Sequence, residues 1–322
     1  MALNTAQQEA VEYVGGPLLI VAGAGTGKTT VLTEKIAHLV ATGLAQPEEI
    51  VALTFTDKAA TELIERVDAR LALGYVDLAV STFHTFCQRL IEEYGVEIGL
   101  PRNCKLVTEV ESWLLLRQNI YDLQLEYYRP LGNPAKYIPE LLRHFSKCKD
   151  ELISPADYLA YADEQPHTIG DDNVDEKSRL TELAGAYHAY NQLLLKNGAL
   201  DFGDLVFYAV KLLRERPRVR AAVAKRFKFL LVDEFQDVNW AQYELVRLLS
   251  EHTQLTVVGD DDQSIYAFRG ANVSNILRFR DDFPNTKSIV LNENYRSHQD
   301  ILDVAYTVIQ NNNPDRLETR LE

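Results

Sequence analysis

Residues 18–30 read Leu-Leu-Ile-Val-Ala-Gly-Ala-Gly-Thr-Gly-Lys-Thr-Thr, and this stretch is the strongest indication of the fold class of the chain. Four apolar residues at 18–21 predict a buried strand, and the apolar spacing over 29–40 predicts a helix. The glycines between them let backbone N–H groups approach phosphate oxygens, and the helix N-terminus adds a partial positive charge. Lys28 would neutralise the β- and γ-phosphates, and the Thr29 hydroxyl would ligate Mg²⁺. The stretch therefore predicts a phosphate-binding loop for ATP and magnesium. The expected nucleotide contacts are Ala22, Gly23, Ala24, Gly25, Thr26, Gly27, Lys28, Thr29 and Thr30.

Two further strand ends carry residues suited to ATP hydrolysis. The apolar run 229–232 ends in Asp233, which can hold Mg²⁺ through its water shell, and Glu234, which can deprotonate an attacking water. The next strand ends in three acids at 260–262, followed by Gln263, whose amide can contact the γ-phosphate. Neighbouring side chains point in different directions, so we do not expect the three acids to share one ion. Parallel sheets bring such strand ends to one edge.

Short apolar runs alternate with helical patterns at both ends of the chain. The expected strands are 18–21, 50–55, 78–82, 229–232, 255–258 and 289–291. Buried strands separated by helices predict an α/β fold with a parallel sheet and right-handed crossovers. The middle, 95–198, is dominated by helical patterns at 112–125, 139–149 and 175–195, so we expect a helical insertion within the sheet domain.

Composition limits the class of protein. The chain has 322 residues, 46% of them hydrophobic, with a formal net charge of −14, which alone argues against a nucleic-acid partner. A basic stretch at 211–228 is either a solvated helical face or a phosphate-contacting surface. The scattered cysteines fit neither a disulfide framework nor a zinc motif. There is neither a secretory signal nor an apolar run long enough to span a membrane, so a reducing cytoplasm is expected. The three cysteines are Cys87, Cys104 and Cys148.

Taken together in chain order, the motifs resemble those of the UvrD/Rep/PcrA type of superfamily 1 DNA helicases. The most specific is Val-Gly-Asp-Asp-Asp-Gln-Ser-Ile-Tyr-Ala-Phe-Arg-Gly-Ala at 258–271, followed by Leu-Asn-Glu-Asn-Tyr-Arg-Ser at 291–297. The other similar segments are Leu3-Asn4 with Gln7, residues 22–30, residues 52–60, Ser81-Thr82-Phe83-His84, residues 200–205 and residues 232–237.

The resemblance implies roles for further residues. Gln7 would hydrogen-bond the adenine, Tyr295 would stack on it, and Arg296 would reach the γ-phosphate as an arginine finger. Thr30 stands where the family often has an arginine beside the base. Aromatic side chains would line a path for single-stranded DNA, since stacking tolerates any base sequence. For these aromatics, core packing is the alternative. The expected DNA contacts are Phe55, Thr56, Phe83, His84, Phe202, Tyr266 and Phe268.

The resemblance also implies a domain plan and an activity. Residues 1–94 and 199–286 would form a RecA-like ATPase domain, 95–198 an inserted helical subdomain, and 287–322 the start of a second RecA-like domain. The expected function is the motor part of an ATP-dependent DNA helicase that moves 3′ to 5′ on single-stranded DNA and acts at junctions with duplex. We expect a monomer that shows little activity as this fragment. The alternatives are a subunit of an AddA/RecB-like helicase–nuclease, a non-catalytic DNA-binding or docking module and, more distantly, a P-loop kinase.

Overall fold

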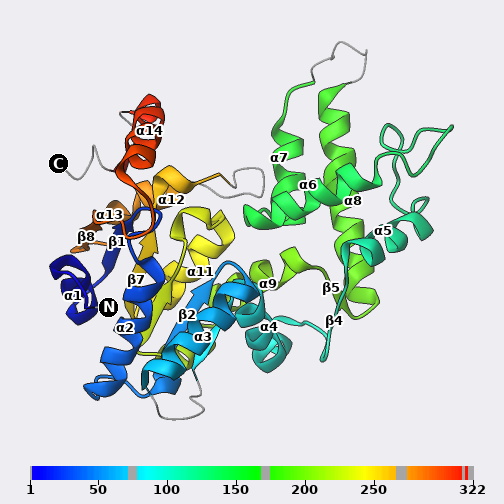
Figure 1. Ribbon diagram of the computed structural model, residues 1–322. Helices are drawn as coiled ribbons and strands as arrows, with labels where there is room; N and C mark the ends of the chain where they lie inside the picture. Colours follow the sequence, from blue (N-terminus) through cyan, green and yellow to red (C-terminus); the bar gives the residue numbers. More distant parts are fainter. Residues whose placement is uncertain (1, 72–77, 168–174, 266–273, 314–315, 318–322) are drawn as a thin grey trace. The chain divides into compact units, whose positions relative to one another are not determined.

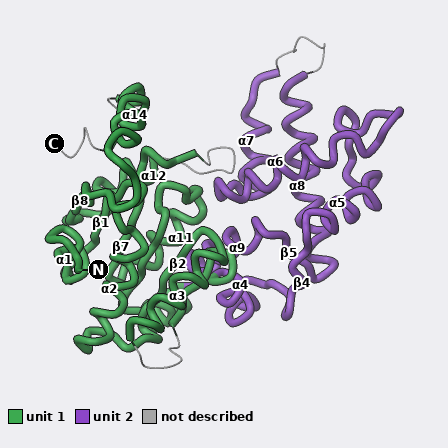
Figure 2. Tube along the Cα trace, in the orientation of Figure 1, with its two compact units in different colours: residues 1–86, 217–322 green, residues 87–216 purple. Residues whose placement is uncertain are grey.

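The chain divides into two compact units in the computed structural model, which describes residues 2–71, 78–167, 175–265, 274–313 and 316–317. Unit 1 comprises residues 1–86 and 217–322, and unit 2 comprises residues 87–216 (Figure 2). Unit 2 is longer than the insertion expected at 95–198, because it also includes residues 87–94 and the helix that follows residue 201.

Unit 1 is built on a six-stranded sheet whose pairings are all parallel (Figure 1). The strand order is β3-β2-β6-β7-β1-β8, which confirms the predicted α/β fold. The strands are apolar through most of their length because both faces of the sheet are covered. They are β1 (Leu18–Ala22), β2 (Ile50–Thr54), β3 (Ala79–Thr82), β6 (Phe229–Val232), β7 (Gln254–Gly259) and β8 (Lys287–Leu291).

Helices between these strands bury their apolar faces against the sheet. One core cluster joins residues of β1, β2, α2 and α3, with Leu18, Ile20 and Ile36 completely buried. The α-helices of this unit are α1 (Thr5–Glu12), α2 (Lys28–Ala41), α3 (Asp57–Leu71), α10 (Pro217–Arg226), α11 (Trp240–Ser250), α12 (Ser274–Leu277), α13 (Phe279–Asp282) and α14 (Gln299–Ile309). Short 3₁₀ turns are η1 (Pro47–Glu49), η3 (Phe235–Asp237), η4 (Asp261–Gln263) and η6 (Gln310–Asn312).

The strand register brings the segments that follow the strands to one edge of the sheet. Val21 in β1 pairs with Gly259 in β7, and Ala22 pairs with Leu291 in β8. Because all six strands are parallel, the segments after β1, β6, β7 and β8 leave the sheet on the same side. This arrangement collects the predicted nucleotide residues at one place.

Strand β8 corrects one expected boundary. Residues 287–322 were expected to begin a second RecA-like domain, but 287–291 form hydrogen bonds along β1 and are an edge strand of the first sheet. Their apolar residues Ile289 and Leu291 are buried in the core of unit 1. No helix in the described part of the chain is long and apolar enough to cross a membrane.

Unit 2 is mainly helical, as predicted for the middle of the chain. Its own core gathers aromatic rings: Phe145 stacks on Tyr187 and Tyr190 with ring centroids 5.3 and 5.5 Å apart. Helix α4 (Phe83–Tyr94) begins in unit 1 and continues into unit 2. The remaining elements are η2 (Gly95–Ile98), β4 (Lys105–Leu106), α5 (Glu109–Gln118), α6 (Ile138–Asp150), α7 (Pro155–Glu164), α8 (Glu176–Lys196), β5 (Ala199–Leu200) and α9 (Phe202–Glu215). Strands β4 and β5 form a separate two-stranded parallel sheet.

Candidate nucleotide-binding site

The predicted phosphate loop connects β1 to α2 in a left-handed backbone that requires glycine. Gly25 has φ +79° and Gly27 has φ +95°, values that residues with a Cβ rarely adopt. The Thr26 hydroxyl donates to the Gly23 carbonyl oxygen at 2.8 Å and closes the turn. Lys28 is the first residue of α2, so the loop ends at the positive end of a 14-residue helix. These features provide the backbone N–H groups and the charge that a phosphate needs.

A cavity of about 370 Å³ opens beside this loop. It unites segments from the N-terminus, the phosphate loop, α3 and the ends of β6, β7 and β8. The residues that line it are Ala2, Leu3, Gln7, Ala24, Gly25, Gly27, Lys28, Thr29, Thr30, Arg66, Glu234, Gln263, Tyr295 and Arg296. All lie in unit 1.

Lys28 is the centre of a polar network in this cavity. Its Nζ donates to Glu234 Oε2 at 2.7 Å and to Gln263 Oε1 at 3.3 Å. The Gln263 amide nitrogen donates in turn to Asp260, and the Gln236 amide nitrogen donates to Glu234 at 2.9 Å. The expected phosphate-binding cation, general base and γ-phosphate contact are therefore brought together from three segments that are distant in sequence.

Asp233 lies at the end of β6 and is almost completely buried. Its Oδ1 accepts the backbone N–H of Glu234 at 2.9 Å, and Glu234 itself has the unusual φ of +48°. Burial, together with the charge of the neighbouring Glu234 carboxylate, raises the pKa of Asp233 to about 6. A buried carboxylate of this kind suits a hard dication, which would offset its burial. Thr29, the other expected ligand, lies in the first turn of α2 and lines the cavity.

The far wall of the cavity is made by residues that follow β8. The Tyr295 N–H donates to the Gly25 carbonyl oxygen at 3.0 Å, and the Asn294 amide nitrogen donates to the Ala24 carbonyl oxygen. The Tyr295 hydroxyl donates to Glu293 at 2.7 Å and accepts from Asn4 at 2.9 Å. The Tyr295 side chain is 50% exposed, so its ring remains available to a base.

Helix α1 supports the loop from the other side. The Gln7 amide nitrogen donates to the Thr26 carbonyl oxygen at 3.0 Å, while its Oε1 accepts the Asn4 N–H at 3.1 Å in a capping box. The buried Lys35 of α2 donates to the Ala10 and Tyr13 carbonyl oxygens at 3.0 and 2.7 Å. Burial lowers the pKa of Lys35 to about 8. Gln7 thus contacts the phosphate loop directly.

Comparison of the sequence with known proteins shows the family to which the chain belongs. Residues 3–284 match the model of the UvrD/REP helicase N-terminal domain. The chain belongs to the UvrD/REP helicase family. The chain is similar to the ATP-dependent DNA helicase PcrA of Leuconostoc citreum, with 41% identity over 97% of the chain, and to that of Bacillus subtilis, with 40% identity over 96%. It spans 39% and 40% of the length of these two relatives.

The residues expected to contact DNA in this UvrD/REP family chain have different surroundings. Thr56 is exposed and caps α3, since its Oγ1 accepts the Ala59 N–H at 3.1 Å. Phe202, in the first turn of α9 in unit 2, is 51% exposed. Phe55 and His84 are half-buried, and burial lowers the pKa of His84.

Three expected DNA contacts remain, and the structure corrects one of them, Phe83. Phe83 is 2% exposed, so in this structure its ring is part of the core and offers no face to a base. Its apolar character at the start of α4 serves packing, the alternative noted for these aromatics. Tyr266 and Phe268 lie outside the described residues.

Several site residues have roles that their motifs do not reveal. Gln236 accepts the Asp260 N–H at 3.0 Å and donates to Glu234, so it joins the ends of β6 and β7. Asn4 and Asn294 hold Tyr295 and the phosphate loop. Only the Asn4–Gln7 spacing, typical of a capping box, could have drawn attention to one of them.

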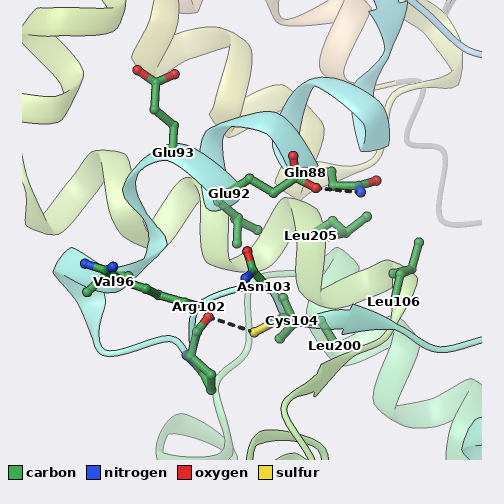
Figure 3. Close-up of a pocket in the computed structure, with 12 residues that line it drawn as sticks. Gln88, Glu92, Glu93, Val96, Arg102, Asn103, Cys104, Leu106, Leu200 and Leu205 are labelled. Carbon is green, nitrogen blue, oxygen red and sulfur yellow. Dashed lines mark hydrogen bonds between the residues drawn. The ribbon is translucent and has the colours of Figure 1, made fainter.

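A second cavity, of about 300 Å³, lies wholly in unit 2 beside α4 and the β4–β5 sheet (Figure 3). The Cys104 thiol at its wall donates to the Pro101 carbonyl oxygen at 3.2 Å, and Gln88 donates to Glu92 at 2.9 Å. Burial raises the pKa of Cys104. Leu200 and Leu205, which belong to one of the segments that carry the family resemblance, are among the residues that line it.

Proposed function

We propose that this chain is the nucleotide-binding part of an ATP-dependent DNA helicase. The observation that carries the proposal is the convergence of Lys28, Glu234 and Gln263 beside a glycine loop at the edge of a parallel sheet. A binding module that did not hydrolyse ATP would have no need for a carboxylate beside the phosphate-binding lysine.

The residues of the cavity would divide the work by their chemistry. The loop N–H groups and Lys28 would bind the phosphates, and Lys28 would exchange Glu234 for a phosphate oxygen as its partner. The released Glu234 carboxylate would accept a proton from the attacking water. Gln263, held by Asp260, would contact the γ-phosphate, and the exposed Arg296 would spread charge in the transition state.

Magnesium fits the site through Thr29 and the buried Asp233. When bound, the ion would neutralise charge on the phosphate oxygens. Mg²⁺ commonly keeps several waters and takes one or two protein ligands together with substrate phosphates. The residues present match that pattern. Gln7 and Tyr295 would face the adenine, because the Gln7 amide nitrogen has a second N–H beside the one that it donates to Thr26.

We further propose that the partner is single-stranded DNA and its junctions with duplex, with 3′ to 5′ translocation in the whole protein. Thr56, Phe55, His84 and the exposed Phe202 are the proposed contacts among the described residues, together with Tyr266 and Phe268. The relatives named PcrA support the choice of DNA. A monomer in the cytoplasm remains our prediction for the state and location.

The test measures nucleotide affinity and ATP hydrolysis by the 322-residue chain with and without single-stranded DNA. Wild type is expected to bind ATP with magnesium, and Lys28→Ala to weaken binding by about 10- to 150-fold, the loss expected for a charge-assisted hydrogen bond. A matched control is Lys105→Ala, which removes an exposed lysine of unit 2. Equal ATP affinity of wild type and Lys28→Ala would overturn the proposal.

A further inference from the structure

The three adjacent acids after β7 each have a different partner. Asp260 accepts from the amide of Gln263, while the Asp261 carboxylate accepts the Leu317 N–H at 2.8 Å. Asp262 accepts from Arg316. Two of the three acids are thus joined to the short segment that follows α14 and η6.

Arg316 forms a bidentate ion pair with Asp262. Its Nε donates to Oδ1 at 2.7 Å and a terminal guanidinium nitrogen donates to Oδ2 at 2.6 Å. Arg316 is 6% exposed, and its guanidinium lies 5.6 Å from the ring centroid of Tyr306 on α14. Leu317 beside it is also buried. A partly buried bidentate pair fixes the relative position of two segments more firmly than a single surface ion pair.

This contact is connected to the nucleotide cavity through a short series of hydrogen bonds. The Asp262 N–H donates to Asp260 Oδ1 at 3.1 Å, Asp260 holds the Gln263 amide, and Gln263 Oε1 accepts from Lys28. The 3₁₀ turn η4 contains only residues 261–263, so a shift of Asp262 moves Gln263 with it. Arg316 therefore restrains the residue proposed to contact the γ-phosphate.

We propose that Arg316 is a positioning residue for ATP recognition. It fixes η4 so that Gln263 meets the γ-phosphate, and it transmits a change at that phosphate to the segment after α14. The inference rests on the proposed nucleotide site. The proposed contact of Gln263 is with the γ-phosphate, which ADP lacks. Loss of Arg316 should therefore weaken ATP binding and leave ADP binding unchanged.

The experiment compares ATP and ADP affinities, in the presence of Mg²⁺, of the full 322-residue chain and of Arg316→Met. Sites coupled in this way typically change affinity by about 5- to 150-fold. We expect at least about a fivefold fall in the ATP-to-ADP affinity ratio, together with a lower kcat for ATP hydrolysis. The matched control is Arg247→Met, because Arg247 makes a similar two-pronged contact with Glu244 at 2.7 and 2.7 Å on α11. The control should keep the wild-type ratio.

An exchange variant separates positioning from general loss of stability. Arg316→Asp combined with Asp262→Arg restores an ion pair of opposite sense, and we expect it to recover part of the ATP-to-ADP ratio. If Arg316→Met does not fold, the ATP-to-ADP affinity ratio is measured in Arg316→Lys, which keeps the positive charge and loses the bidentate geometry. An unchanged ratio, an equal loss for ATP and ADP, or the same loss in Arg247→Met would overturn the inference while the proposed function stands. Failure of wild type to bind ATP would instead refute the proposed function, and this inference with it.

Discussion

Gly25 lies against the stem of Arg296, so closely that a Cβ on Gly25 would stand 2.7 Å from the Arg296 Cβ. We predict that Gly25→Ala lowers the free energy of unfolding by more than the roughly 1–2 kcal/mol that a left-handed backbone costs a residue with a Cβ. The excess arises because the loop or the segment after β8 must shift. Denaturant unfolding measures the loss, and nucleotide affinity should fall with it.

Gly43 supplies the control for that variant. It has φ +71°, and a Cβ added there would meet no heavy atom within 4 Å. Gly43→Ala therefore measures only the stability that a Cβ costs on a left-handed backbone, and it should leave nucleotide affinity unchanged. If both alanine variants lose the same stability and bind nucleotide equally well, the close contact of Gly25 with Arg296 is unimportant.

The contact between Lys28 and Glu234 predicts opposite effects on binding and on chemistry. In Glu234→Gln, Lys28 loses a charged competitor for the phosphates, so ATP affinity should stay the same or rise. Hydrolysis should fall by about 10²- to 10⁴-fold, the usual contribution of a general base. Single-turnover hydrolysis and equilibrium binding separate the two effects. Glu251→Gln, at an exposed ion pair with Arg220, is the control. An unchanged hydrolysis rate in Glu234→Gln would show that another group accepts the proton.

Asp150 at the end of α6 predicts a pH-dependent gain in stability. Burial first, and then the charges of Glu151 and Asp201, raise its pKa to about 7. The ionised carboxylate therefore disfavours the folded state above about pH 7, and this penalty disappears as the pH falls toward the ordinary value of 3.8. Asp150→Asn should raise the free energy of unfolding by about 1–3 kcal/mol at about pH 8, and by clearly less at about pH 5.

Urea unfolding of wild type and Asp150→Asn at both pH values makes this measurement. The control is Asp122→Asn, which changes an exposed aspartate of the same unit. A gain of equal size at both pH values would mean that removing the charge of Asp150 is not the cause.

Lys149 predicts a large loss of stability in unit 2. It is 0% exposed, and its Nζ lies 2.7 Å from Asp201 and 2.8 Å from Asp204. Lys149→Met would leave the buried Asp204 carboxylate and the partly buried Asp201 carboxylate without their cation. Breaking a buried ion pair in this way typically costs about 3–5 kcal/mol. Adding Asp204→Asn removes one of those charges, so the double variant should recover part of the loss. If the double variant is less stable than Lys149→Met, the ion pair is not what Lys149 contributes.

Much of the sheet could be predicted because its strands are continuous apolar runs. The run 229–232 matches β6 at both ends, and the runs 18–21 and 50–55 differ from β1 and β2 by one residue. The domain boundaries were harder to predict, since they depend on packing between elements. Helix α9 carries an apolar pattern that suits either unit, and only its contacts with α6 and η2 assign it to unit 2. Likewise, β8 was misplaced because pairing with β1 leaves no mark in its own sequence.

The nucleotide site shows the same division between local and long-range information. The phosphate loop could be predicted because its strand, loop and helix are consecutive in sequence. The position of Asp233 and Glu234 could be predicted because they directly follow an apolar strand. The hydrogen bonds from Gln7 to Thr26 and from Asn4 to Tyr295 could not be predicted. In each pair the two residues are distant in sequence, so the bond depends on the folded arrangement. Phe83 was assigned to DNA because a motif does not state which way a side chain points.

Helix α1 has a practical consequence for anyone who expresses this protein. It is attached to the phosphate loop through Gln7 and to α2 through Lys35, and Ala2 and Leu3 lie in the wall of the cavity. A shortened gene product that begins after α1 would retain every loop glycine and still lose one side of the site. An affinity tag fused ahead of Ala2 would emerge at the mouth of that cavity, where it could compete with ligands.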